Sequence, residues 1–422
     1  MKILILGNGK TGKSLKGWFE KQNCTVKIFD DDQSISQVNF VEAVEFCPDR
    51  VVLSPSFKKS HPLVQKLRQT SVVLSQLDMF GSLPMVSITG TNGKTTVVSL
   101  CNYILTNCNK KCFAVGNFGL PISEVLEKPF DWLICETSSF MLEQSFTPFA
   151  PNVSVLTNFD QDHLDFHGSL GQYALAKSLN FINQREDQVA IFNGDDPYFD
   201  YFSKQCCSKK LVVSTKRNAN CCLDGKVVCF DFNNIRQTAI CHWFDNLEKH
   251  DQTNYLLSFA VCVLLGATLE ECIKYAETFS KPNHRLKKVV TIDNVTFIND
   301  SKATNVHATL AALKSVGGKV FLIVGGSDKG EDFSRLFPHV KNVVVCAIGQ
   351  TANKIANTGK KYQKEVICCQ TLDQAVHLGW SVLNSFGGGT VLLSPASASF
   401  DMFDSYAQRG EKFEEICKNI SK

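Results

Sequence analysis

The stretch that decides the fold is VSITGTNGKTTVV, residues 86–98, in which a short apolar run leads into a glycine-rich turn. A buried strand that ends in such a turn and opens a helix brings backbone N–H groups and the positive end of the helix to a phosphate group. Lys94 would neutralise the β- and γ-phosphates, and the Thr95 hydroxyl would bind Mg²⁺. The turn predicts an ATP site made by Gly90, Thr91, Asn92, Gly93, Lys94, Thr95 and Thr96.

The glycine spacing of this turn departs from the common phosphate-loop pattern. Two residues, and not four, separate Gly90 from Gly93, and Ile88 stands where the first glycine would be. The spacing argues against a generic ATPase. An ordinary strand-to-helix turn without a ligand is the alternative interpretation.

The rest of the chain repeats the order strand, turn, helix. Short runs rich in Val, Ile and Leu, such as 2–6, 132–135, 153–157, 189–193 and 320–324, are typical of parallel strands buried on both faces. Helical patterns lie between such runs, for example at 95–106 and 171–183. This alternation predicts an α/β protein with doubly wound domains. The secondary structure of residues 200–245 is the least predictable from the sequence.

The length of 422 residues indicates more than one domain. We predict a Rossmann-like N-terminal domain at 1–82, a central mononucleotide-binding domain with the phosphate loop at 83–281, and a second Rossmann-like domain at 282–422. The first boundary follows from the turn formed by Gly81 and Ser82 before Pro84.

Composition excludes several classes of protein. A net charge of +3 without a basic run gives no sign of nucleic-acid binding. The apolar runs are too short to cross a membrane, and the run at the amino terminus is too short for a signal peptide, so we expect a cytoplasmic protein. The 18 cysteines contain no CxxC pair, which favours reduced thiols that pack as small apolar side chains.

The turn GNGKTG at residues 7–12 matches the GxGxxG dinucleotide pattern, and Asp30 ends the next apolar run, where a ribose contact would be expected. The pattern alone leaves three interpretations open. The turn could bind NAD or a flavin, bind the diphosphate of another nucleotide, or only allow a strand and a helix to pack closely. A GxGxxG dehydrogenase is therefore an alternative of a different class.

Acidic and basic residues follow two further strands. Glu136 ends the strand at 132–135, where a carboxylate could reach a metal ion held by the phosphate loop. The segment 157–165 groups three aspartates around His163, and Lys177 lies in the helical pattern that follows. A solvated acidic loop, a zinc pair of His163 with His167, and a helix-surface lysine are the alternatives.

Taken in order, these motifs resemble the Mur ligase family over essentially the whole chain. The resemblance rests on TGTNGKTT, on ETSSF (136–140), on the loop with Asp162 and His163, and on DSKATN (300–305). GNGKTG, GNFGLP (116–121), GGSDKG (325–330) and LLSPASASFD (392–401) are most similar to the member that adds D-glutamate.

The resemblance implies an ATP-dependent, amide-bond-forming ligase of peptidoglycan precursor synthesis. Such an enzyme transfers the γ-phosphoryl group of ATP to the carboxylate of UDP-N-acetylmuramoyl-L-alanine. The amine of D-glutamate then attacks the acyl phosphate, and ADP and phosphate are released. The N-terminal domain would bind the UDP substrate, the central domain ATP, and the third domain the amino acid. Another Mur ligase and folylpolyglutamate synthase are the alternatives within the class, and a non-catalytic nucleotide-binding module lies outside it.

By match of motif, the resemblance also implies a role for single residues. Lys94, His163 and Lys177 would be catalytic. Thr95 and Glu136 would bind one Mg²⁺, and His163 a second one together with Lys177, which the family carries as a carbamate. Further ATP contacts would come from Asn254, Arg285 and Asp300. The UDP substrate would contact Lys10, Thr11, Asp30, Asp31, Asp32, Ser54, Asn117 and His163. D-glutamate would contact Lys302, Thr304, Lys329, Ser399 and Tyr406.

Three positions depart from the family pattern. Asp251 stands where asparagine is usual, Tyr406 replaces phenylalanine, and Ser56 replaces glycine. We expect a monomer.

Overall fold

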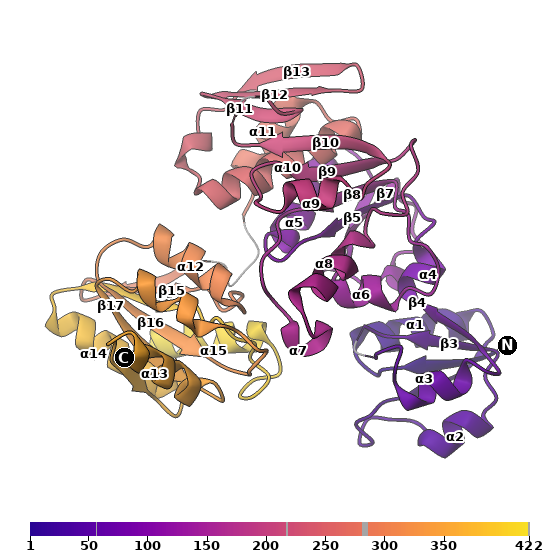
Figure 1. Cartoon of the computed structure of the whole chain (residues 1–422), viewed down its shortest axis with the longest axis horizontal. Coiled ribbons are helices and arrows are strands. Elements are labelled where there is room, and N and C mark those ends of the chain that lie inside the picture. Colours follow the sequence, from indigo (N-terminus) through magenta and orange to yellow (C-terminus); the bar gives the residue numbers. More distant parts are fainter. Residues whose placement is uncertain (56, 217, 281–285, 421–422) are drawn as a thin grey trace. The chain divides into compact units, whose positions relative to one another are not determined.

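The structure is a computed structural model that describes residues 1–55, 57–216, 218–280 and 286–420 (Figure 1). The chain divides into two compact units. The first comprises Met1–Phe159 and Ala174–Ser280, and the second comprises Asp160–Tyr173 and the chain from residue 281 onward. Each unit contains β-sheets whose strands are mainly parallel, as the alternation of strands and helices predicts. None of the helices in the described ranges is long and apolar enough to span a membrane.

The first unit begins with a four-stranded parallel sheet of order β2-β1-β3-β4. Its central strands are buried on both faces, because Ile3 and Ile5 pack into one apolar cluster and Leu4 and Leu6 into another. This sheet lies within residues 1–82. The elements are β1 (Lys2–Leu6), α1 (Lys10–Lys21), β2 (Thr25–Phe29), α2 (Phe40–Glu45), β3 (Arg50–Leu53), α3 (Pro62–Leu67), β4 (Val72–Ser75) and α4 (Gln76–Phe80).

The second sheet of the first unit has nine strands in the order β13-β12-β11-β10-β9-β8-β5-β7-β6. It is parallel from β6 to β11, whereas β12 and β13 are antiparallel additions formed by part of the segment that the sequence left unreadable. The strands are β5 (Met85–Thr89), β6 (Cys112–Gly116), β7 (Trp132–Glu136), β8 (Val153–Leu156), β9 (Val189–Asn193), β10 (Lys209–Ser214), β11 (Cys221–Asp224), β12 (Val227–Phe232) and β13 (Ile235–Ile240). The helices are α5 (Lys94–Asn107), α6 (Ser139–Gln144), α9 (Phe199–Ser203), α10 (Lys249–Leu264) and α11 (Leu269–Glu277). Helix α8 (Leu170–Ser178) begins in the second unit and continues in the first from Ala174.

One predicted helix is wrong in its length. The pattern at 171–183 predicts a helix to residue 183, but α8 ends at Ser178. The chain turns there, and the buried side chain of Asn180 donates hydrogen bonds to the backbone oxygens of Ser87 (3.1 Å) and Val155 (3.4 Å). A buried amide that joins two strands outweighs the helical propensity of the residues around it.

The second unit contains a six-stranded sheet of order β14-β15-β19-β16-β17-β18, antiparallel only between β14 and β15. Its strands are β14 (Lys287–Ile292), β15 (Val295–Asn299), β16 (Val320–Gly325), β17 (Val343–Ile348), β18 (Val366–Cys368) and β19 (Gly389–Leu393). Its helices are α7 (Leu164–His167), α12 (Val306–Ser315), α13 (Ala352–Lys361), α14 (Leu372–Ser385) and α15 (Tyr406–Asn419).

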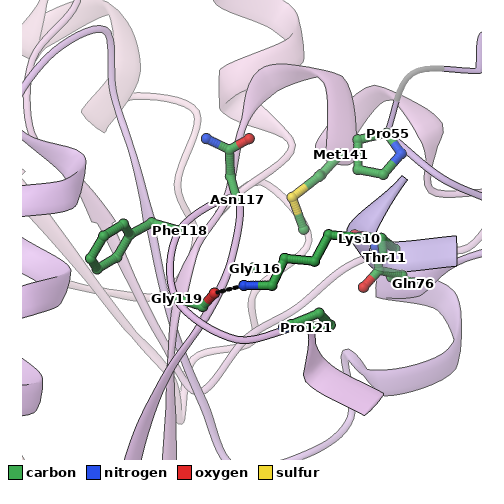
Figure 2. Close-up of a pocket in the computed structure, with 10 residues that line it drawn as sticks. All are labelled: Lys10, Thr11, Pro55, Gln76, Gly116, Asn117, Phe118, Gly119, Pro121 and Met141. Atoms are coloured by element: carbon green, nitrogen blue, oxygen red, sulfur yellow. Dashed lines mark hydrogen bonds between the residues drawn. The ribbon is translucent and has the colours of Figure 1, made fainter. Parts of the chain in front are cut away.

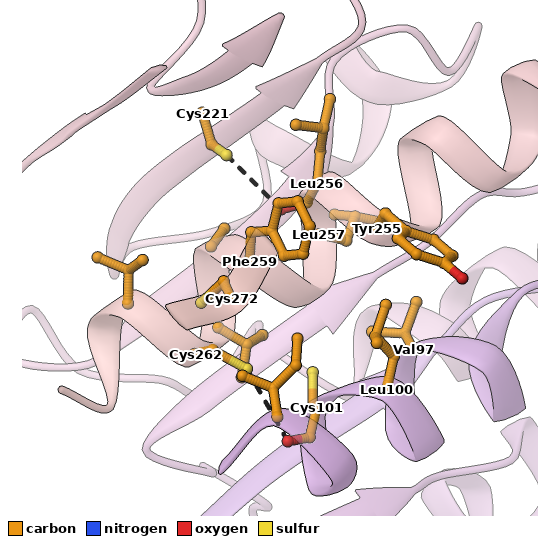
Figure 3. Close-up of a cluster of buried hydrophobic side chains, with 14 of the residues drawn as sticks. Val97, Leu100, Cys101, Cys221, Tyr255, Leu256, Leu257, Phe259, Cys262 and Cys272 are labelled. Carbon is orange, nitrogen blue, oxygen red and sulfur yellow. Dashed lines mark hydrogen bonds between the residues drawn. The ribbon is translucent and has the colours of Figure 1, made fainter. Parts of the chain in front are cut away.

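All 18 cysteines are free thiols. Figure 3 shows four of them, Cys101, Cys221, Cys262 and Cys272, among the apolar side chains between α5, α10 and α11. Burial raises the pKa of the Cys221 and Cys262 thiols well above the ordinary value. These thiols therefore stay protonated and serve as small apolar packing groups, as the sequence predicts.

Candidate active site

The carboxyl ends of four neighbouring strands of the nine-stranded sheet carry the first group of candidate residues. Strands β8, β5, β7 and β6 are adjacent and parallel, so the turns that follow them meet at one edge. The phosphate loop follows β5, Glu136 ends β7, and Asn117 follows β6. The turn after β8 contributes Thr157 and Asn158.

The phosphate loop needs its glycines. Gly90 has φ +147°, and a side chain there would overlap the Thr157 hydroxyl. Gly93 has φ +82° and immediately precedes α5, which begins at Lys94. Because Gly93 has no side chain to cap the helix, the first N–H groups of α5 are available to an anion. The loop is thus a phosphate cradle at a helix N-terminus.

Asn158 holds the backbone of this loop. Its backbone oxygen accepts from the Thr91 N–H (3.0 Å), and its side-chain oxygen accepts from the Asn92 N–H (2.9 Å). Its side-chain NH₂ donates to the Asn92 carbonyl (3.1 Å). Sequence reasoning did not assign Asn158 a role, because the only signal was its place after a predicted strand.

Two lysines meet on the carbonyl oxygen of Gly90. Lys94 Nζ donates to it at 2.6 Å and to the Thr91 carbonyl at 2.8 Å, and Lys177 Nζ donates to it at 2.8 Å. The Lys177 side chain is buried, with 1 % of its surface exposed. The structure therefore brings together two lysines that lie far apart in the sequence, beside the phosphate cradle.

Glu136 links the loop to the next strand. The Thr95 hydroxyl donates to Glu136 Oε2 at 2.7 Å, and the Asn117 NH₂ donates to Glu136 Oε1 at 2.8 Å. A buried carboxylate and a hydroxyl are oxygen ligands of the kind that Mg²⁺ prefers, with phosphate and water completing the shell. These residues fit a magnesium ion. Over the described part of the chain, no group of three or more His, Cys, Asp and Glu side chains is arranged to hold a metal ion.

Of the predicted ATP contacts outside the loop, Asn254 lies beside the cradle. A side chain at Gly93 would overlap the Asn254 amide. Its neighbour on α10, Asp251, is buried and lies 3.6 Å from His250 Nε2. Asp300 belongs to the second unit, and Arg285 and Ser56 lie outside the described residues.

A cavity of about 460 Å³ lies in the first unit beside Asn117 (Figure 2). Lys10 reaches into it from α1 and donates to the Gly119 carbonyl at 2.9 Å. Asn117, which lines the cavity, also donates to Glu136, and Glu136 accepts from Thr95 directly after the phosphate loop, so two hydrogen bonds link the cavity wall to the loop. The cavity is lined by Lys10, Thr11, Pro55, Gln76, Gly116, Asn117, Phe118, Gly119, Pro121 and Met141.

The other predicted UDP contacts follow β2 and β3. Asp30 Oδ2 accepts from the Asn8 N–H at 2.7 Å, so this carboxylate fixes the glycine turn at 7–12. Asp31 pairs with His61 at 3.0 Å, and Asp32 accepts from the Ser34 hydroxyl at 2.6 Å. Ser54 lies directly after β3, and a side chain at Gly7 would overlap its hydroxyl.

The second unit repeats this design with the adjacent parallel strands β15, β19 and β16. Asp300, Lys302 and Thr304 follow β15, Ser399 follows β19, and Lys329 follows β16. Lys302 Nζ lies 3.8 Å from the centre of the Tyr406 ring, a cation–π contact. The five residues predicted to bind D-glutamate are Lys302, Thr304, Lys329, Ser399 and Tyr406, and all lie in this unit.

Arg409 holds together the turns at the carboxyl ends of β15 and β19, which form part of the second edge. Sequence reasoning did not identify this residue. Its guanidinium donates to the Ser301 hydroxyl (2.9 Å) and to the carbonyls of Ser301 (2.9 Å), Ser397 (3.1 Å) and Ala398 (3.2 Å). Burial lowers the pKa of Arg409 to about 9, which leaves it charged at neutral pH. A single side chain on α15 thus joins the turn after β15 to the turn after β19.

His163 belongs to the second unit and not to the first, where the other predicted magnesium ligands lie. It has a left-handed backbone, φ +53°, and its N–H donates to Asp162 Oδ1 at 2.9 Å. Asp162 also accepts from Asn305 (3.1 Å) and from Lys329 (3.4 Å). The His163 loop is therefore tied to residues of the DSKATN and GGSDKG motifs.

The fold and this site define a class, namely an α/β enzyme that holds a nucleotide on a glycine-rich loop. The Mur ligase middle domain matches residues 88–261, and the Mur ligase glutamate ligase domain matches residues 284–397. The UDP-N-acetylmuramoylalanine–D-glutamate ligase of Clostridioides difficile is 30% identical, over 99% of this chain and 98% of its own length. The ligase of the same name from a Geobacillus species is 34% identical, over 98% and 96%.

Solved structures of low identity share the fold. UDP-N-acetylmuramate–alanine ligase MurC of Thermotoga maritima has a TM-score of 0.62 at 17% identity, with 100% of each chain covered. MurF ligase from Thermotoga maritima in complex with ADP has a TM-score of 0.60 at 16% identity, covering 99% of this chain and 95% of that chain. The chain belongs to the Mur ligase family, with its three-domain α/β fold, and is an ATP-dependent ligase.

Proposed function

We propose that the protein ligates D-glutamate to UDP-N-acetylmuramoyl-L-alanine, with conversion of ATP to ADP and phosphate. The full-length similarity to ligases of that name supports the substrate pair. The observation that carries the chemistry is the convergence of Lys94 and Lys177 on the phosphate loop beside the buried Thr95–Glu136 pair. This reaction belongs to cytoplasmic peptidoglycan precursor synthesis.

In this proposal, each part of the first unit holds one anionic reactant. The cradle at 90–96 binds the ATP phosphates, and Lys94 neutralises the charge on the γ-phosphoryl group as it is transferred. The cavity at Lys10 and Asn117 takes the UDP substrate, so that its terminal carboxylate faces the phosphate edge through the Asn117–Glu136 link. A carboxylate is a poor electrophile until its oxygen becomes part of a phosphate leaving group, which explains the requirement for ATP.

The second unit holds the amino acid. Lys302 and Lys329 offer cations, and Thr304 and Ser399 offer hydroxyl groups, to the two carboxylates of D-glutamate. Tyr406 orients Lys302 through the cation–π contact. The amine of D-glutamate is then the nucleophile that attacks the acyl phosphate.

Magnesium would be held by Thr95 and Glu136 at one site, and by His163 and a carbamylated Lys177 at a second. The metal would offset the negative charge of the transferred phosphoryl group. Lys177 is buried and donates to the Gly90 carbonyl, and reaction of its amine in the neutral form with CO₂ would give the carbamate. As a carbamate, the side chain would carry a negative charge and would offer oxygen atoms as ligands to the metal ion.

The direct test of the substrates is phosphate release with UDP-N-acetylmuramoyl-L-alanine and a panel of L- and D-amino acids. We expect release with D-glutamate alone among them, and only when both substrates and Mg²⁺ are present. Turnover with another amino acid and none with D-glutamate would refute the assignment. An absorbance change with NAD(P)H would instead support a dehydrogenase.

The carbamate is tested by Lys177→Ala. We expect this variant to lose most of its turnover and to regain part of it with millimolar formate or acetate, because a short carboxylate supplies the missing oxygen ligand. Turnover measured with and without the added acid checks this. A fully active Lys177→Ala variant would exclude the carbamate.

A further inference from the structure

The segment Asp160–Tyr173 belongs to the second unit, although the chain before and after it belongs to the first. The chain changes from the first unit to the second between two successive residues, Phe159 and Asp160. The Phe159 N–H donates to Asp196 Oδ2 at 2.9 Å within the first unit, and the ring of Phe159 packs on Tyr198 and Phe202. The next residue, Asp160, pairs with Arg335 and His307 of the second unit. The segment carries His163, so whatever anchors it also positions His163.

Asp160 is held by an arginine that neither the sequence patterns nor the family resemblance assigned. Arg335 donates to both carboxylate oxygens of Asp160, at 3.1 and 2.9 Å, and His307 lies 3.8 Å away. Burial is the largest single influence and opposes ionisation of Asp160. The hydrogen bonds from Arg335 and from the Gln161 N–H, with the charges of His307 and Arg335, together outweigh it, so that the pKa of Asp160 falls below its ordinary value. A two-bond arginine–carboxylate pair fixes direction as well as distance.

The segment has a conformation that requires support. A left-handed backbone at a residue with a side chain costs about 1–2 kcal/mol, and His163 has φ +53°. The contacts of Asp162 with Asn305 and Lys329 stabilise that turn from one side. The Asp160–Arg335 pair anchors the same turn three residues earlier in the chain.

We propose that Arg335 is a positioning residue, which fixes the His163 loop to the second unit through Asp160. The catalytic consequence rests on the function proposed above, in which His163 contributes to the reacting site. Arg335 itself contacts no reactant in this scheme. Its loss should therefore change how often His163 is correctly placed, and leave the phosphate cradle of the first unit unchanged.

The test compares Arg335→Met, which removes the charge, with Arg335→Lys, which keeps the charge but cannot form the two-bond pair with the carboxylate of Asp160. Hydrogen–deuterium exchange of the full chain without ligands measures how often the loop at 160–173 opens, and steady-state kinetics measure the effect on turnover. We expect exchange in peptides covering 160–173 to rise about tenfold in Arg335→Met and less in Arg335→Lys. The kcat should fall about tenfold, with the KM for ATP little changed.

The matched control is Arg185→Met, which breaks an exposed arginine–aspartate pair (Arg185 Nε to Asp187 Oδ1, 3.2 Å) in the first unit. It should leave both readouts at the wild-type level, and both Met variants should melt within about 2 °C of the wild type. Unchanged exchange in 160–173 of Arg335→Met would overturn the proposal, whatever happens to activity. Faster exchange with no turnover of the proposed substrates, even in the wild type, would keep the anchor and refute the proposed function.

Discussion

The carboxyl edge of the nine-stranded sheet and that of the six-stranded sheet are built alike but held together differently. At the first edge, a contiguous glycine-rich loop forms the site, and Asn158 and Thr157 from the neighbouring strand's turn hold its backbone. At the second edge, three separate turns form the site, and the buried Arg409, more than a hundred residues from Ser301, joins two of them.

This difference predicts which property of the protein a substitution at each edge should change. The cradle at the first edge is made of backbone N–H groups, so loss of a side chain that only faces the phosphates should alter chemistry more than folding. The second edge depends on buried charge, and removal of a buried charged partner leaves polar groups without bonds. Substitutions at the first edge should therefore reduce turnover, whereas substitutions at the second should reduce stability and amino-acid binding together.

The largest effect is expected from Lys94→Ala at the first edge. Loss of the cation beside the γ-phosphoryl group should lower kcat by roughly 10³-fold, because the transferred charge is no longer neutralised. Phosphate release measures the loss, and calorimetric titration should show that the UDP substrate still binds. Lys111→Ala, which removes an exposed lysine at the start of the next strand, should keep full turnover. Similar losses in both variants would contradict the phosphate-loop assignment.

At the second edge, Arg409→Met should act on stability first. Three carbonyls and a hydroxyl lose their donor, which should lower the free energy of unfolding by about 2–4 kcal/mol. The KM for D-glutamate should rise about tenfold or more, with the KM for ATP nearly constant. Denaturant unfolding and kinetics measure the two effects. The control is Arg236→Met, where the arginine is exposed and pairs with Asp231. A stable Arg409→Met variant with a normal KM would show that the two turns need no bridge.

The same difference explains what could be predicted from the sequence. The strands, their parallel order and the phosphate loop follow from local patterns, because apolar runs and glycine spacing are contiguous in the chain. The meeting of Lys94 and Lys177 was inferred only through the family resemblance, since 83 residues separate them. Arg409 and Asn158 could not be predicted, because their roles depend on carbonyl groups that only the folded turns bring close.

The assignment of His163 shows a further limit. The sequence places it between two segments of the central domain, and a local interpretation keeps it with them. The structure assigns residues 160–173 to the second unit, through ion pairs with Arg335 and Lys329 that no local pattern encodes. The predicted domain boundaries at 82 and 281 describe the chain order and leave this crossing out.

A smaller effect is expected from Asn158→Ala at the first edge. The variant loses two side-chain bonds to Asn92 but keeps the backbone bond to Thr91, so the loop should loosen without unfolding. We expect kcat/KM for ATP to fall about tenfold. Asn158→Asp keeps an acceptor for the Asn92 N–H but places a negative charge beside the phosphates, so it should lose more than Asn158→Ala. A wild-type kcat/KM for ATP in Asn158→Ala would show that the two bonds to Asn92 do not matter.

The substitution Glu331→Gln tests the second edge through the dependence of stability on pH, with turnover at neutral pH the property least affected. Glu331 is buried at the second edge and accepts from the Val306 N–H at 3.0 Å. Burial, together with the charge of Asp162, raises the pKa of Glu331 to about 8. Since the pKa is raised in the folded state, the stability linked to this group is full below about pH 4.5 and is lost as the pH rises through 8. Wild type should lose on the order of 2 kcal/mol more than Glu331→Gln between pH 5 and 8, because the amide cannot ionise. Unfolding curves at several pH values measure this difference, and parallel pH profiles for the two proteins would mean that Glu331 is already ionised at neutral pH.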